Sequence, residues 1–296
     1  MKHLSEPIRA LAMEEPEKRI VSIKSGCWIG YERAQKAVER IESLLTHPKR
    51  SRMPNLLIIG ATNNGKTMIT ERVMKLHPRT FSEDGEKEII PILRVQMPPA
   101  PSSSIFYTEL LKAIEFPVKT IGKLENRMLT VYNLLKRINV RILIIDELHN
   151  MLSANASRQR EMLGLLRFIG NELCMPMVCL GTQEARDAIR SDPQLENRFE
   201  PIFLPFWKND LAFCNLLASY EISLPLRKVS NLTEDHLRNE IFIKSDGMIG
   251  EISAILEKAA IIAIRTGEER ITLDIVKKTG HQSPTERRRS FESVML

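Results

Sequence analysis

The chain has 296 residues, 43% of them hydrophobic, with 43 Lys and Arg against 37 Asp and Glu. This length and composition exclude a disulfide-stapled miniprotein and a largely disordered chain, and they fit one large module with a small satellite or two ordinary domains. The net charge of +6 permits nucleic-acid binding but falls short of the charge density of a purely electrostatic DNA-coating protein.

The cysteines and the N-terminal sequence indicate a cellular compartment. Cys27, Cys174, Cys179 and Cys214 form no CxxC pair and show no metal-ligand spacing, so we interpret them as reduced thiols. The first residues contain no apolar leader, and no segment approaches the roughly 18 consecutive apolar residues of a membrane span. These features predict a cytoplasmic protein with no membrane partner.

The first part of the chain changes from polar to periodic near Trp28. Residues 1–27 lack sustained periodicity, which predicts an arm or weak helix that becomes ordered on a partner. Apolar residues recur at helical spacing over 31–45 and predict an amphipathic helix. A short basic run, with Lys49, Arg50 and Arg52, then leads into an apolar strand at 56–59.

Short apolar segments alternate with helical patterns in the middle of the chain. The further strand candidates are 89–95, 142–145, 177–180 and 202–204, and the helical patterns include 124–138 and 162–173. This alternation predicts an α/β core with a parallel sheet and helices on both faces, over residues 28–206.

After residue 206 only helical patterns remain. We expect a helix cap at Asn209, a helix over 232–243 and another through 252–262, which together form a small all-helical domain over 207–280. Residues 281–296 contain Pro284 and the run from Arg287 to Arg289, and they predict a flexible basic tail.

The segment after the first strand fits the pattern GxxxxGK[ST] and lies directly before a helical stretch. It reads Gly60, Ala61, Thr62, Asn63, Asn64, Gly65, Lys66, Thr67, with Met68 as the next residue of the helix. Such a loop wraps phosphates with its backbone amides, while Lys66 supplies charge to the β and γ phosphates and Thr67 reaches Mg²⁺. A chance glycine turn before a lysine is the alternative, and the correctly placed strand disfavours it.

Two carboxylates, Asp146 and Glu147, end the apolar strand 142–145. In a parallel sheet this strand end lies beside the phosphate loop, so Asp146 is placed to hold Mg²⁺ and Glu147 to orient or deprotonate the attacking water. A surface acidic pair is the alternative, which would be the default interpretation if the strand stood alone.

Two further candidates lie near strand ends. Thr182 or Gln183 follows the strand 177–180 and Gly181, where a polar side chain can sense the γ-phosphate; a simple turn explains the segment equally well. Arg198 precedes the last strand and can serve the nucleotide of a neighbouring subunit. For Arg198 the alternative is an ordinary surface salt bridge.

Together these motifs resemble an AAA+ ATPase with a P-loop, RecA-like core and a C-terminal helical lid. Within that superfamily the strings DELHN at 146–150, GTQEA at 181–185 and PTERRR at 284–289 resemble the TniB/TnsC transposition regulators, over about residues 25–290. The resemblance implies that Trp28 and Ile29 pack on the adenine, that Thr182 is the first sensor and that Arg198 is a trans-acting finger.

One lid segment departs from the family pattern. Many AAA+ lids carry Gly-x-x-Arg as a second sensor, but this chain reads GMIGE at 247–251. The resemblance then implies weak hydrolysis that depends on DNA or a partner, and a switch rather than a motor.

The resemblance also implies cofactors and partners: ATP with Mg²⁺, other copies of the chain in a ring or helical filament, duplex DNA bound without sequence preference, a DDE transposase of TniA/TnsB type and, as a further candidate, a TniQ-like targeting protein. It implies a bacterial source and disassembly driven by hydrolysis. Candidate DNA contacts are Lys119, Thr120 and Lys123, with Arg94 as a lesser candidate. Each of these lysines is at least as well explained as a solvated surface charge.

Two other functions remain open from the sequence. A nucleotide-gated adaptor or helicase loader would bind ATP as a switch and act by holding other proteins, without DNA-stimulated turnover. A P-loop kinase would need an acceptor site and a basic closing lid, and the C-terminal helical domain and Arg198 argue against it.

Overall fold

The structure is a computed structural model that describes residues 1–117 and 122–294. The chain divides into two compact units. We call Arg33–Leu204 the sheet unit, and Met1–Glu32 together with Pro205–Leu296 the helical unit.

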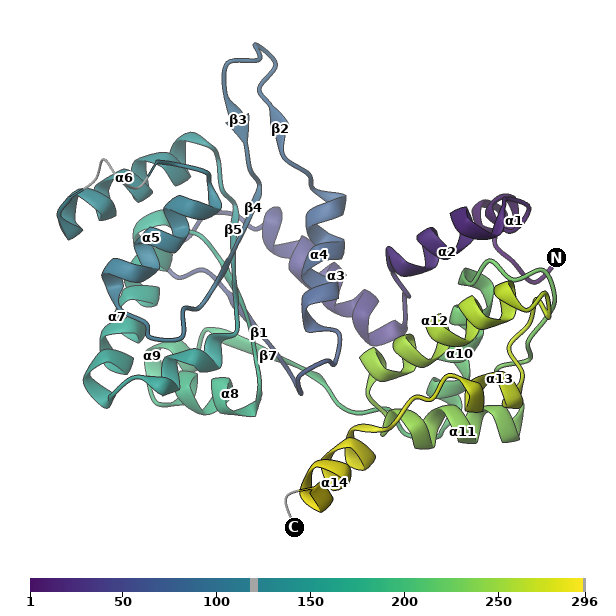
Figure 1. Cartoon of the computed structure of the whole chain (residues 1–296). Coiled ribbons are helices and arrows are strands. Elements are labelled where there is room, and N and C mark those ends of the chain that lie inside the picture. The colour runs from purple at the N-terminus through teal and green to yellow at the C-terminus, as the bar shows by residue number, and fades with distance from the viewer. Residues whose placement is uncertain (118–121, 295–296) are drawn as a thin grey trace. The chain divides into compact units, whose positions relative to one another are not determined.

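The sheet unit is built on five parallel strands (Figure 1). In the order of the sheet they are β4 (Ile92–Gln96), β5 (Ile142–Asp146), β6 (Met177–Gly181), β1 (Asn55–Gly60) and β7 (Phe199–Leu204). The sequence prediction of a parallel α/β core is therefore confirmed. Since β1, β5 and β6 are covered on both faces, they are almost continuous apolar runs rather than alternating ones.

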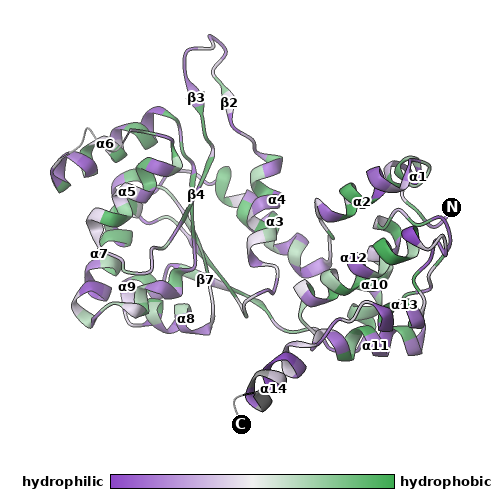
Figure 2. Cartoon of the chain, in the orientation of Figure 1, coloured by the Kyte–Doolittle hydropathy of each residue, from purple (hydrophilic) through white to green (hydrophobic). Residues whose placement is uncertain are grey.

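Helices cover both faces of this sheet. Figure 1 shows α3 and α4 beside one face and α5, α6 and α7 beside the other. The helices of the unit are α3 (Glu32–Leu45), α4 (Lys66–Leu76), α5 (Ser103–Ala113), α6 (Leu124–Arg137), α7 (Ala156–Leu173), α8 (Gln183–Arg190) and α9 (Pro193–Glu196), with a 3₁₀ turn η2 (Leu148–Ser153). Hydrophilic and hydrophobic residues alternate along most of them, as Figure 2 shows, because each helix buries only one side.

One strand candidate was too long. The apolar run 89–95 divides into β3 (Glu88–Ile89), which pairs with β2 (Thr80–Phe81) in a separate antiparallel hairpin, and β4 of the main sheet. Pro91 lies between β3 and β4 and has no N–H to donate to a ladder, which explains the division.

The helical unit contains seven helices in its described residues. They are α1 (Glu6–Ala12), α2 (Pro16–Lys24), α10 (Leu211–Ser223), α11 (Asp235–Ser245), α12 (Ile249–Arg265), α13 (Leu273–Lys278) and α14 (Pro284–Val294). The cap expected at Asn209 is one residue later, since the side chain of Asp210 accepts from the N–H of Phe213.

Residues 1–27, for which the sequence suggested an arm or a weak helix, form α1 and α2. Ile20 and Ile23 join the apolar core that α10 and α12 build. Arg19 is fully buried, and its guanidinium donates to the Pro225 carbonyl at 2.6 Å and to Glu269 Oε1 at 2.9 Å. Arg19 and Glu269 are far apart in the chain, so no local sequence pattern predicts this pair.

Replacing Arg19 by Ala should lower the free energy of unfolding by about 3 kcal/mol, because it leaves the buried Pro225 carbonyl and the partly buried Glu269 carboxylate without the guanidinium. The matched control is Lys18→Ala on the same helix. Lys18 pairs with Glu14 at 2.8 Å, but both side chains are exposed, so its loss should change this free energy little. Urea denaturation followed by circular dichroism measures both values, and equal values would contradict the anchoring role of Arg19.

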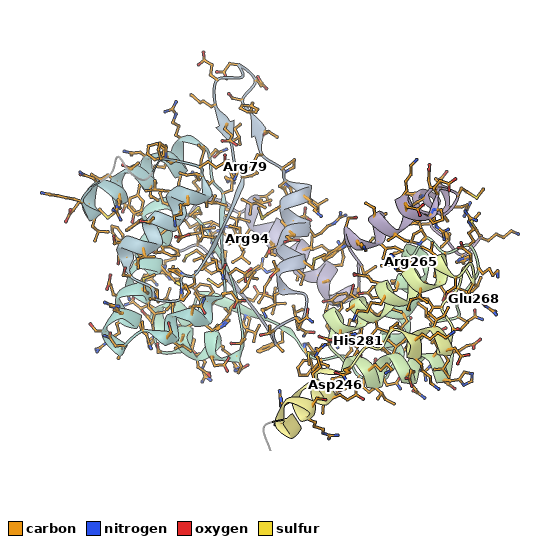
Figure 3. All side chains as sticks on the ribbon, viewed as in Figure 1. Arg79, Arg94, Asp246, Arg265, Glu268 and His281 are labelled. Atoms are coloured by element: carbon orange, nitrogen blue, oxygen red, sulfur yellow. The ribbon has the colours of Figure 1, made fainter. Side chains whose placement is uncertain are left out.

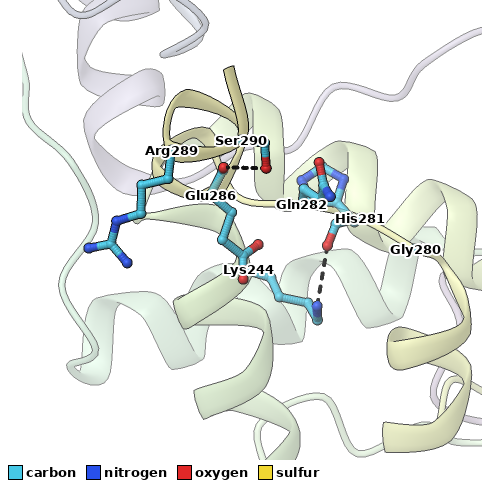
Figure 4. Close-up of a pocket in the computed structure, with 7 residues that line it drawn as sticks. All are labelled: Lys244, Gly280, His281, Gln282, Glu286, Arg289 and Ser290. Carbon is cyan, nitrogen blue, oxygen red and sulfur yellow. Dashed lines mark hydrogen bonds between the residues drawn. The ribbon is translucent and has the colours of Figure 1, made fainter. Parts of the chain in front are cut away.

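The last segment forms α14, where the sequence predicted a flexible tail. Glu251 joins it to α12, since its carboxylate accepts from Arg287 at 2.8 Å and lies 2.9 Å from Nε2 of the buried His281. Burial of Glu251 opposes ionisation, but its interactions with Arg287 and His281 outweigh burial and hold its pKa below the usual value. Figure 4 shows the neighbouring bond from Lys244 Nζ to the His281 carbonyl, at 3.2 Å.

Candidate functional site

The phosphate loop joins β1 to α4 and adopts the backbone that its glycines permit. Gly65 has a φ of 82° directly before α4, in the left-handed region that favours glycine, and Asn63 has a φ of 59°. A Cβ at Gly60 would lie 3.2 Å from the Leu204 carbonyl oxygen, so this position also requires close backbone approach. The loop thus directs backbone N–H groups and the start of a helix toward one point.

Lys66 and Asn64 are held inside this loop. Lys66 is 6% exposed, and its Nζ donates to the carbonyls of Gly60 and Ala61, each at 2.8 Å. Burial lowers the pKa of its amine, whereas the negative charges of Glu147 and Asp146 act in the opposite direction. The Asn64 side chain donates to the Leu204 carbonyl at 2.6 Å, which fixes the loop on β7.

Thr67, Asp146 and Glu147 meet at the carboxyl end of β5. The Thr67 hydroxyl donates to Asp146 Oδ2 at 3.3 Å, and the Glu147 N–H donates to Asp146 Oδ1 at 2.9 Å. Glu147 adopts a left-handed backbone with a φ of 53°, and its Oε2 lies 3.2 Å from His149 Nε2. A hydroxyl and carboxylates at one point form the oxygen donor set that Mg²⁺ prefers.

Thr182 follows β6, the strand between β5 and β1. Its hydroxyl donates to the Glu184 carboxylate and, with the nearby backbone N–H, lowers the pKa of that group. A Cβ at Gly181 would lie 2.4 Å from the Ala185 Cβ, so only glycine lets α8 approach the strand this closely. The structure therefore brings the phosphate loop, the acidic pair and Thr182 to the same edge of the sheet.

Arg198 lies at the opposite edge. Its carbonyl accepts from the N–H of Asn55 at 2.8 Å, at the amino ends of β7 and β1, and its guanidinium donates to Asn171 Oδ1 at 2.8 Å. Six residues of extended β1 span about 17 Å, so Arg198 is too far away to reach phosphates held by the loop of its own chain.

The other sequence candidates belong to the helical unit, to other parts of the sheet unit, or to residues that the structure does not describe. Ile29 is buried in the core of the helical unit and Trp28 is half-buried in the same unit, which does not contain the phosphate loop. Lys119 and Thr120 lie outside the described residues. Lys123 is exposed directly before α6.

Arg94 is on the edge strand β4, where Figure 3 labels it. It forms an ion pair with Glu71 of α4 at 3.4 Å. Its charge is thus partly neutralised within the sheet unit.

Two features of the sheet unit were not among the predicted site residues: His149 and the pair Arg50 and Arg52. His149 contacts Glu147, and the string DELHN gave a local signal for it. Arg50 and Arg52 line a cavity with Arg198, although only their basic character was visible in the sequence. The loops that carry them meet only in the folded sheet.

Solved structures share this architecture. The Aeropyrum pernix ORC2 protein matches with a TM-score of 0.58 at 18% identity, over 83% of this chain and 66% of that one. The Cdc6p of Pyrobaculum aerophilum gives 0.62 at 14%, over 87% and 69%, and the Aeropyrum pernix ORC1 protein gives 0.52 at 16%, over 83% and 63%. At these identities the likeness shows the fold alone, which is that of the AAA+ ATPases.

The chain spans about two-thirds of the length of these structures. No curated protein matches the sequence. None of the helices in the described ranges, 1–117 and 122–294, combines the length and apolar character needed to cross a bilayer. The model of the family described as bacterial TniB protein matches residues 19–209, and the chain therefore belongs to the TniB family.

Proposed function

We propose that this chain is an ATP-hydrolysing regulator of transposition that assembles on duplex DNA and recruits a DDE transposase. The observation that carries the ATPase part is the bonded set of Lys66, Thr67 and Asp146, with Glu147 beside it, at the carboxyl edge of the sheet. The relatives by fold support the class, since the Aeropyrum pernix ORC2 protein was solved in ADPNP–ADP complexes and the ORC1 protein with DNA. Membership of the TniB family supports the transposition branch.

In this proposal, residues of one chain bind the phosphates and activate the water for hydrolysis. Lys66 exchanges its two carbonyl partners for oxygens of the β and γ phosphates, since the loop already holds the amine in place. Thr67 and Asp146 would hold Mg²⁺, which neutralises phosphate charge when it is bound. Glu147 accepts the proton of the attacking water, and the Thr182 hydroxyl turns from Glu184 to donate to a γ-phosphate oxygen.

The site is completed by a neighbour in this proposal. Arg198 is at the far edge of its own sheet, so it contributes charge to the nucleotide of a second copy. A head-to-tail contact of this kind repeats from copy to copy and produces a ring or a filament. Hydrolysis removes the γ-phosphate that the contact needs, and the assembly then comes apart.

A nucleotide-gated adaptor is the second candidate, and the lid segment favours it. Where the Gly-x-x-Arg pattern has its arginine this chain has Gly250, and the next residue, Glu251, is engaged by Arg287 of α14. This alternative predicts ATP-dependent binding of partner proteins without turnover stimulated by DNA.

Electron microscopy with duplex DNA tests the proposal. The wild-type protein should form ordered assemblies on DNA with ATP or a non-hydrolysable analogue. Lys66→Ala should form none, because it lacks the positive charge that binds the β and γ phosphates. Lys75→Ala changes an exposed lysine of the same helix and should assemble like the wild type. Wild-type monomers unaffected by nucleotide and DNA would contradict the proposal.

A further inference from the structure

The amino edge of the sheet contains a cavity that the proposed function has not used. The loop before β1, together with α9 and the residues that join α9 to β7, lines a space of about 540 Å³. Its charged lining consists of Arg50, Arg52 and Arg198, with His47 beside them, and no carboxylate of the described chain is among the lining residues. Gln194 and Asn197 add neutral polar groups.

Arg50 and Arg52 of this cavity have no carboxylate partner in the part of the chain that the structure describes, whereas neighbouring arginines do. In the described ranges, no hydrogen bond or ion pair engages the guanidinium groups of Arg50 and Arg52. By contrast, the adjacent Arg167 pairs with Asp192 at 3.3 Å, and Arg190 pairs with Glu196 at 3.1 Å. The cavity therefore concentrates positive charge.

Arg52 lines the same cavity as Arg198, and its charge acts on that of Arg198. Burial lowers the pKa of the Arg198 guanidinium, and repulsion from Arg52 and then from Arg167 lowers it further, whereas the Asp192 carboxylate acts in the opposite direction. Two like charges held near one another in a hollow are stabilised by an anion between them, as phosphates are by paired arginines.

The shape of the site indicates a compact anion from another molecule. The phosphate loop of the same chain lies about 17 Å away at the other end of β1, so its nucleotide cannot fill the cavity. A cavity of this volume has room for the terminal phosphates of a nucleotide. The backbone of duplex DNA would instead be bound by an open, extended basic surface.

We propose that Arg52 acts with Arg198 as a second trans-acting arginine, and that the two guanidiniums hold the terminal phosphates of a nucleotide bound to a second copy of this chain. The inference rests on the proposed function and adds a residue to its shared site. Arg52 donates N–H groups to γ-phosphate oxygens, whose charge becomes spread over all three in the transition state. Because Arg198 and Arg52 both come from the second copy, hydrolysis then depends on the contact between the two copies.

Hydrolysis by mixed variants tests this assignment. Arg52→Ala should lower DNA-stimulated turnover by about 10- to 100-fold, the range for one lost hydrogen bond to a charged group. Arg52→Lys should retain part of the rate because it keeps the charge. Arg190→Ala removes an ion-paired arginine outside the cavity and should keep the wild-type rate.

Rescue identifies the donor of the arginine. In an equal mixture of Arg52→Ala with Glu147→Gln, about a quarter of head-to-tail interfaces combine an intact base with an intact Arg52, so turnover should rise to about a quarter of the wild-type value. Circular dichroism and sizing of each variant establish that it folds and assembles.

The outcomes separate this inference from the proposed function. If the wild type shows no ATP turnover with DNA, the proposed function fails. If the wild type turns over and Arg198→Ala does not, an unchanged rate in Arg52→Ala overturns the assignment of Arg52 alone. A loss that mixing does not rescue also overturns it, and if the slope of DNA affinity against salt falls by about one as well, the cavity binds the DNA backbone instead.

Discussion

Replacing Glu147 by Gln is expected to lower the rate of ATP hydrolysis by about 10²- to 10⁴-fold, the contribution of a general base. The amide keeps the size and the polar contact of the carboxylate but cannot accept the proton of the attacking water. Lys66, Thr67 and Asp146 are unchanged, so ATP should still bind. The variant should therefore remain assembled on DNA with ATP, which electron microscopy and single-turnover hydrolysis would show together.

The control for this experiment is Glu109→Gln. Glu109 is on α5, where it pairs with Lys112 at 2.7 Å on the surface. It should hydrolyse ATP and disassemble like the wild type. Rapid turnover by Glu147→Gln would contradict the assignment of Glu147 as the base. It would not contradict the assignment of the phosphate loop.

The second large effect is expected at Arg198. Removing its guanidinium in Arg198→Ala should lower turnover by about 10³- to 10⁵-fold, the range for an arginine finger. Arg198→Lys restores the charge but not the planar fork of donors, so it should recover only part of this loss. Steady-state hydrolysis at saturating DNA and protein measures both variants.

Nucleotide affinity distinguishes this role from a structural one. A trans-acting arginine leaves the loop of its own chain intact, so Arg198→Ala should bind a fluorescent ATP analogue as tightly in the monomer as the wild type does. If monomer binding and turnover fell in the same proportion, Arg198 would act on the fold, through Asn171 and the start of β7, instead.

The sheet and its phosphate edge were predictable because they depend on local patterns. The apolar runs of β1, β5 and β6 reflect burial on both faces, and Gly65–Lys66–Thr67 must follow a strand for its N–H groups to converge. The carboxyl ends of parallel strands meet at one edge, so the position of Asp146 beside Thr67 followed from strand direction alone.

Other features depend on residues far apart in the chain. The buried pair of Arg19 and Glu269 places α1 and α2 in the helical unit, and Glu251 holds α14 through Arg287. Neither arginine differs in sequence from a solvated surface residue. The cavity at Arg52 was hidden for the same reason, because the segments before β1 and before β7 that line it are brought together only by the pairing of β1 with β7.

The central claim is that each ATP site is shared between two copies assembled on DNA. Its most direct test is the turnover per protomer as the wild-type concentration is raised, with and without duplex DNA. The account predicts that turnover rises steeply with concentration and that DNA shifts the rise to lower concentrations, because only assembled copies have Arg198 at the phosphates. A turnover per protomer that stays constant from dilute monomer to assembled protein would contradict it.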